Sequence, residues 1–190
     1  MKYLKLMFVI ALFAGLSSCD DKAANTDTKE IAEDHNEAKY DESSKEKDAQ
    51  FLVNAAEINL AEIQLGAFAQ QNSKNAEVIS LGMMMEEAHR ASLKDLTALA
   101  AKKLITIPTA PTETANEMLA KLKGEKINDF DKAYCDMMVS QHTDAVAMFD
   151  NAATVSADDD IKSWATSTLT VLRTHLDKAM VCQKQFESKK

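Results

Sequence analysis

The chain has 190 residues, of which 46% are hydrophobic and 27% are charged, which is enough for one domain with an apolar core. Its formal net charge of -8 argues against nucleic acid as a partner. Only 4 Gly and 2 Pro interrupt a composition rich in Ala, Leu, Met, Lys and Glu, so the sequence predicts an all-α protein.

The N-terminus has the features of an export signal over residues 1–18. Lys2 and Lys5 precede an apolar run that is too short to span a bilayer. The run ends in a Leu-Ser-Ser-Cys sequence that resembles a bacterial lipobox, and this resemblance implies cleavage before Cys19 and lipidation of its thiol. The alternative is an ordinary secretory signal with an incidental Cys. Both interpretations predict an exported protein. With the lipid anchor, we expect it in the cell envelope, in the periplasm or at the outer membrane.

Residues 19–48 follow as an acidic segment. Between residues 20 and 48 there are 11 Asp or Glu against 5 Lys, and large apolar residues are almost absent. Such a segment cannot bury an apolar face, so we expect a flexible tether here and a folded domain over residues 49–190.

Apolar residues at helical spacing predict four long helices in that domain. They cover residues 49–71, residues 74–104, residues 127–154 and a last stretch that begins after Ser156 and runs nearly to the C-terminus. Asn128 and Ser156 are the expected caps of the third and fourth helices.

The connection between the second and third helices is long. Pro108 and Pro111 end the second helix, and a short helix capped by Thr114 and Glu117 lies before Gly124. Two tight hairpins joined by one long crossover form the ferritin-like arrangement of a four-helix bundle, in which the second and third helices are parallel.

Each long helix carries one acidic or imidazole side chain in its apolar stripe near its midpoint: Glu62, His89, His142 and His175. Facing residues of antiparallel helices have residue numbers with a constant sum. This sum is 317 for His142 with His175 and also for Cys135 with Cys182. The two histidines therefore face each other if the two cysteines do.

Three imidazoles and a carboxylate at one level form a ligand set for Zn, Cu, Fe or Mn. Met85, Met138 and Glu86 are additional candidate ligands, and thioethers would favour copper. The alternative is a hydrogen-bonded polar layer that contains no ion, because a Glu bonded to core histidines also satisfies these groups. The residues alone leave both interpretations open.

The sequence gives little support for an enzyme. A di-iron centre of the bundle type needs a Glu-x-x-His on each of two helices. Only Glu86 and His89 have this spacing, because Val139 and Leu172 occupy the corresponding positions before His142 and His175. A di-iron centre is therefore disfavoured, and no nucleophile-and-base arrangement is apparent.

Two cysteines remain once Cys19 is assigned to lipidation. Disulfides persist in exported proteins, and both cysteines fall on the predicted interface of the third and fourth helices. We expect Cys135 and Cys182 to be bridged, or close enough to bridge, one heptad from His142 and His175. The alternative is a pair of inert buried thiols.

Four stretches in order carry a resemblance to a known family: FLVNAAEINLAEIQLGAFAQ, LGMMMEEAHRASLKDLTALAAKKLITIP, FDKAYCDMMVSQHTDAVAMFDNA and WATSTLTVLRTHLDKA. Over about residues 50–182 the chain resembles a ferritin-like family of exported bacterial proteins, the domain of unknown function number four-one-four-two. The family's motif positions are matched by Glu62, His89, His142 and His175. Its usual Asp before the second-helix His is Ala88 here, which removes a possible partner of His89.

The family carries no biochemical activity, so the resemblance implies a fold and leaves two function classes. The first is a lipid-anchored envelope protein that binds a transition metal through the mid-bundle layer. The second is a metal-free structural or stress-related envelope protein. The sequence does not indicate a protein partner.

Overall fold

The computed structural model describes residues 27–40 and 43–187. Within these ranges the chain forms six helices and no strand, so the all-α prediction is confirmed. The helices are α1 (Thr28–Glu37), α2 (Ser43–Asn72), α3 (Ala76–Lys103), α4 (Glu113–Lys123), α5 (Phe130–Val155) and α6 (Asp159–Glu187).

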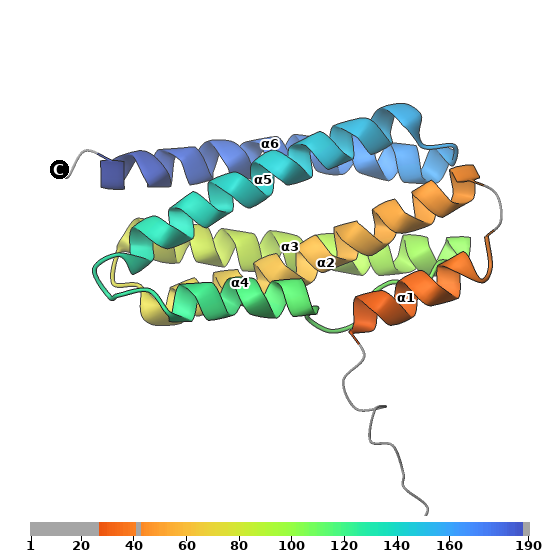
Figure 1. Ribbon diagram of the computed structural model, residues 1–190. Coiled ribbons are helices and arrows are strands. Elements are labelled where there is room, and N and C mark those ends of the chain that lie inside the picture. The colour runs from red at the N-terminus through yellow and green to blue at the C-terminus, as the bar shows by residue number, and fades with distance from the viewer. Residues whose placement is uncertain (1–26, 41–42, 188–190) are drawn as a thin grey trace, which may run out of the picture.

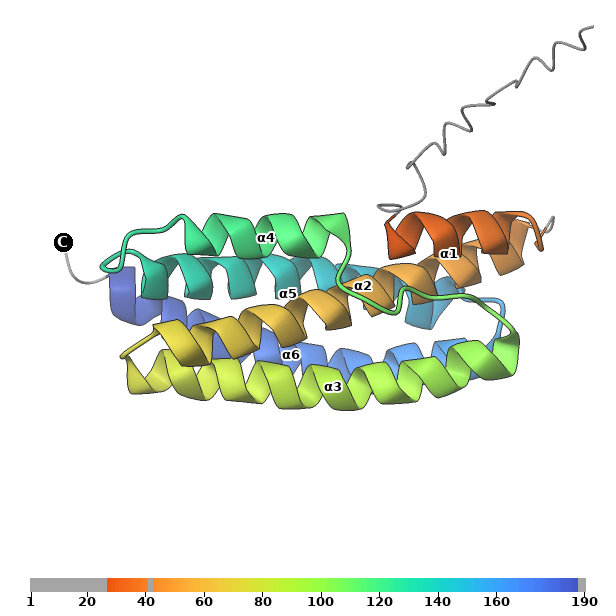
Figure 2. The ribbon, with the colours of Figure 1, turned by 90° about the horizontal axis from the view of Figure 1, so that it is seen from below.

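The four long helices pack as two antiparallel hairpins, α2 with α3 and α5 with α6 (Figure 1). Helices α3 and α5 run in the same direction, so the connection between them returns along the length of the bundle and carries α4. The two short helices, α1 and α4, follow one another along one side of the bundle (Figure 2), where both pack on α2.

The N-terminal caps of α4, α5 and α6 differ from those predicted. Thr112 caps α4 in place of Thr114, because its Oγ1 accepts a hydrogen bond from the backbone N–H three residues on. Helix α5 begins at Phe130 rather than near residue 127. Asp158 caps α6 through bonds from two backbone N–H groups, while Ser156 ends α5. For α4 and α6 a nearby polar side chain satisfies orphan backbone groups in place of the predicted one, whereas no side-chain hydrogen bond caps the start of α5.

The folded region begins before residue 49, the predicted boundary of the tether. Ala32 is fully buried, and the amide of Asn36 makes two hydrogen bonds with the backbone of Thr106, one donated (2.8 Å) and one accepted (2.9 Å). Lys29 also pairs with Glu57 at 2.7 Å. Polar contacts to distant residues therefore order a segment that has too few apolar residues to form a face of its own.

The remaining N-terminal predictions lie outside the described residues. These are the signal peptide of residues 1–18, lipidation of Cys19 and the first part of the tether. No helix in the described part of the chain has both the length and the apolar character needed to cross a membrane.

The core consists of two apolar clusters with a polar layer between them. The first cluster includes Leu65, Met85, Tyr134 and Met138. The second includes Leu52, Leu96, Phe149 and Leu172. On α5 the boundary between the clusters falls at His142, which is 1% exposed.

Helices α2 and α3 approach closely at a pair of glycines. A Cβ atom added to Gly66 would lie 2.6 Å from the carbonyl oxygen of Gly82, and one added to Gly82 would lie 2.8 Å from that of Gly66. Their residue numbers have the same sum as those of Asn59 and His89, which lie seven residues away on each helix. The glycine contact thus sets the register that places Asn59 against His89.

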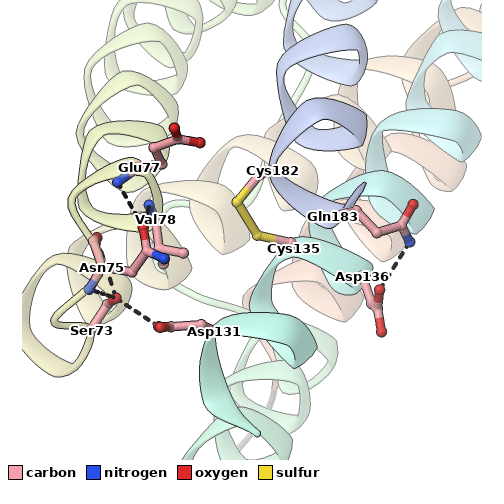
Figure 3. The surroundings of a disulfide bond; sticks show 9 residues. All are labelled: Ser73, Asn75, Glu77, Val78, Asp131, Cys135, Asp136, Cys182 and Gln183. Atoms are coloured by element: carbon pink, nitrogen blue, oxygen red, sulfur yellow. Dashed lines mark hydrogen bonds between the residues drawn. A yellow bond between two sulfur atoms is a disulfide. The ribbon is translucent and has the colours of Figure 1, made fainter. Parts of the chain in front are cut away.

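A disulfide holds the other hairpin one heptad from its histidines (Figure 3). Cys135 of α5 and Cys182 of α6 are joined, with their Cα atoms 5.9 Å apart. Nearby, the Ser73 hydroxyl donates to Asp131 at 2.6 Å and ties the α2–α3 turn to the start of α5. The bridged pair fixes the α5–α6 register in which His142 lies opposite His175.

Candidate metal centre

His89, His142 and His175 meet in the middle of the bundle and are called the histidine triad below. Their ring centroids are 5.5, 5.4 and 5.3 Å apart, so the rings form a nearly equilateral triangle. None of the three is more than 4% exposed. One ring nitrogen of each lies within 4.8 Å of the other two, an arrangement that can hold a metal ion.

Two of the imidazoles are oriented by hydrogen bonds at their outer nitrogens. His89 Nδ1 lies 3.0 Å from the amide oxygen of Asn59, and His142 Nδ1 lies 3.0 Å from the backbone oxygen of Met138. Both partners accept, since the Asn59 amide nitrogen donates to the Ala55 carbonyl. Each Nδ1 therefore carries the proton, and each Nε2 presents a lone pair.

The two Nε2 atoms lie close enough to share one ligand position. The Nε2 atoms of His89 and His142 are 3.4 Å apart. Two nitrogens bound to a tetrahedral metal at ~2.05 Å are separated by about 3.35 Å, which agrees with this distance. The third imidazole also has a free atom, because His175 Nδ1 is buried and has no hydrogen-bond partner among the described residues.

Burial keeps all three imidazoles neutral. It lowers the pKa of His142 and of His175 to about 4 and that of His89 well below its usual value, and neighbouring imidazoles add to the effect at His89 and His142. Neutral imidazole is the form that binds a metal, so these ligands need lose no proton at pH 7.

Glu62 stands next to the triad rather than within it. Its Oε1 lies 3.8 Å from His142 Nδ1, while its Oε2 is buried without a partner among the described residues. Burial raises the pKa of Glu62 to about 8, so the group is an uncharged acid at pH 7. The phenol of Tyr134 is likewise buried, and both burial and the neighbouring Glu62 raise its pKa.

The additional candidate ligands have other roles. Glu86 lies outside the triad, and its carboxylate accepts hydrogen bonds from Gln70 at 2.7 Å and from Arg90. Met85 and Met138 are fully buried in the first apolar cluster, and Met138 supports His142 through its backbone carbonyl.

Asn59 is a residue of the site that the sequence interpretation missed. It is 3% exposed and fixes the tautomer of His89. It thus supplies a hydrogen-bond partner for His89, which the Ala88 side chain cannot do. A signal was present: Asn59 precedes Glu62 by three positions, which puts both on one face of α2.

Comparisons with known proteins agree on the domain and leave its activity open. Residues 32–181 match a family described as Domain of unknown function (DUF4142). No curated protein matches the chain. The crystal structure of a DUF305 fragment from Deinococcus radiodurans is similar, with a TM-score of 0.62 and 18% sequence identity over 73% of this chain and 96% of that one. At this identity the similarity shows a shared fold alone.

Proposed function

We propose that this chain, which the match over residues 32–181 shows to belong to the DUF4142 family, binds one transition metal ion in the histidine triad. The family itself is described as a domain of unknown function. We further propose that its bundle is ferritin-like, which the parallel α3 and α5 and the long crossover support.

One observation carries the metal proposal. His89 Nε2 and His142 Nε2 lie 3.4 Å apart, while acceptors hold the proton of each ring on Nδ1. Two unprotonated nitrogens at this distance repel each other unless a cation or a proton lies between them. A metal ion bound by these nitrogens and by His175 removes this conflict without disturbing either outer hydrogen bond.

The ligand chemistry narrows the choice of metal. Three neutral imidazoles suit Zn and Cu first, and also Fe and Mn. Glu62 lies next to the triad, and a nearby dication would favour the ionised form of its carboxyl group and so supply a compensating charge. A single carboxyl cannot provide the bridging carboxylates of a di-iron centre, so a mononuclear site fits best.

The metal prediction is tested with the protein's fourth histidine as the control. His35 lies exposed on α1, outside the triad. The purified protein should take up about one equivalent of Zn²⁺ or Cu²⁺, His142→Ala should abolish this uptake, and His35→Ala should retain it. Metal content and calorimetric titration measure these outcomes, and the melting temperature should rise with metal only in proteins that bind it.

A metal-free polar layer is the second candidate function. The distance of 3.4 Å also allows an N–H···N hydrogen bond if one ring moves its proton to Nε2. In that case the wild-type protein takes up no transition metal. His142→Ala would then lower the free energy of unfolding by about 1–3 kcal/mol because partners are left unsatisfied.

We also propose that the protein is exported and attached to a membrane through a lipid on Cys19. The lipobox-like sequence supports this location, and the Cys135–Cys182 disulfide suits an oxidising compartment. Cys19→Ala should move the protein from the membrane fraction to the soluble fraction or block its maturation. Unchanged fractionation would contradict the lipid anchor, whatever the outcome of the metal experiment.

A further inference from the structure

A small cavity lies beside the triad between α3 and α6. It has a volume of about 20 Å³, which is room for the centre of one water molecule. Its walls include two triad members and several neighbours: Ala88, His89, Ser92, Thr168, Leu172 and His175.

The cavity extends from the triad toward the surface. His89 and His175 are at most 4% exposed, whereas Ala88, Ser92 and Thr168 are partly exposed. Val171, which also lines the cavity, is 46% exposed. The outer wall is thus made of small side chains, two of which carry hydroxyl groups that can hydrogen-bond a passing polar molecule.

Glu62 is not among the residues that line this cavity. The cavity is therefore not filled by this carboxyl group, although Asn59 on the same face of α2 lines it.

From this arrangement we infer that the metal ion keeps one coordination position open toward the α3–α6 cavity. This position takes a small monodentate ligand, such as water, hydroxide or an anion of the size of azide. The inference rests on the proposed metal function and deepens it. Three protein ligands plus an exchangeable one is the geometry of sites that bind or activate small molecules, whereas purely structural sites have four protein ligands.

Size limits the class of external ligand. A space of about 20 Å³ admits a molecule about the size of water or a narrow linear one, and larger side-chain-sized groups do not fit. Coordination is a simple exchange: a lone pair of the incoming ligand forms a bond to the metal as bound water leaves.

The experiment uses the purified protein loaded with Co²⁺, whose visible absorption reports its coordination. Azide should change this spectrum in a saturable manner. Ala88→Leu places a larger side chain in the cavity and should weaken azide binding about tenfold or more, while it leaves Co²⁺ stoichiometry unchanged. Ala91→Leu is the matched control, because Ala91 is exposed on the same helix. This variant should bind azide as the wild type does. Ser92→Leu is a second blocking variant, should Ala88→Leu fail to fold.

The outcomes separate the inference from the proposed function. If Co²⁺ binds and azide leaves the wild-type spectrum unchanged, the open position is wrong and the metal site stands. The cavity is also excluded as the route if the folded blocking variants bind azide as tightly as the wild type. If no Co²⁺, Zn²⁺ or Cu²⁺ binds, both the proposed function and the inference fall.

Discussion

The side chains of Glu62 and the triad can stay buried without a metal because all four are uncharged. Glu62 is protonated at pH 7, and His89, His142 and His175 are uncharged, since burial disfavours the ionised form of each. Burying four neutral groups costs far less than burying one unpaired charge. The layer therefore adds little electrostatic strain to the metal-free fold, and its cost depends on pH.

The pH dependence of stability follows from the signs of these shifts. Folding lowers the pKa of His142 and His175 from 6.5 to about 4, so the unfolded chain binds more protons and stability rises with pH over this window. Folding raises the pKa of Glu62 from 4.5 to about 8, so its contribution is full below pH 4.5 and is lost as pH rises toward 8.

We predict that the metal-free protein loses about 2 kcal/mol of unfolding free energy between about pH 6.5 and 8 through Glu62, at ~1.4 kcal/mol per pH unit. Glu62→Gln should remove this loss and leave the rise at lower pH. Urea denaturation at several pH values, with a chelator present, measures the difference. Identical pH profiles for the two proteins would show that Glu62 is ionised in the folded state.

At the scale of the helices, each hairpin has its own device that fixes register. Gly66 and Gly82 bring the backbones of α2 and α3 together, and the Cys135–Cys182 disulfide joins α5 to α6. Both devices lie seven residues from site residues on their helices. A substitution at either device should therefore change the relative positions of the triad side chains.

Gly66→Ala tests the first device. The added methyl group would meet the backbone oxygen of Gly82, which cannot rotate away, so the helices must separate. We expect a loss of about 1–3 kcal/mol in unfolding free energy, although Ala is the better helix former. Gly124→Ala is the control, because its methyl group would meet atoms no closer than 3.4 Å, and it should be nearly neutral. Equal effects in both variants would rule out the close approach of α2 and α3.

The features that depend on helical periodicity could be predicted from the sequence. Four helical stripes with one polar residue each predicted that His89, His142 and His175 share a level, and the constant sum of residue numbers predicted which α5 and α6 residues face each other. The predicted caps of α4 and α6 were wrong because polar side chains two residues away compete for the same backbone groups, and periodicity does not distinguish them.

At the scale of the whole molecule, α1 joins the N-terminal segment to the crossover. The Asn36 amide bonds the Thr106 backbone, and Tyr40 Oη donates to the carbonyls at the end of α3 at 3.1 Å. Partners 70 residues apart leave no local trace in the sequence. For this reason the acidic segment looked like a tether, although part of it is folded against the bundle.

Asn36→Ala should release α1 from the crossover. The variant loses two hydrogen bonds at a buried site. This loss should lower the free energy needed to detach α1 from the bundle by about 1–3 kcal/mol. Trypsin should then cleave after Lys29 and Lys39 faster than in the wild type, as mass spectrometry of the fragments would show. The exposed Glu37→Ala, next in the chain, should leave both cleavage rates unchanged. Equal rates in Asn36→Ala and the wild type would contradict the docking of α1.

The division of the triad between the hairpins has a dynamic consequence. His89 belongs to the α2–α3 hairpin, and His142 and His175 belong to the α5–α6 hairpin. Contacts within each hairpin are much denser than contacts between the two. The softest motion of the bundle is therefore a separation of two stiff halves, and an ion held by all three imidazoles would resist it. Metal binding would slow amide hydrogen exchange along the whole seam between the hairpins, far beyond the residues that touch the ion.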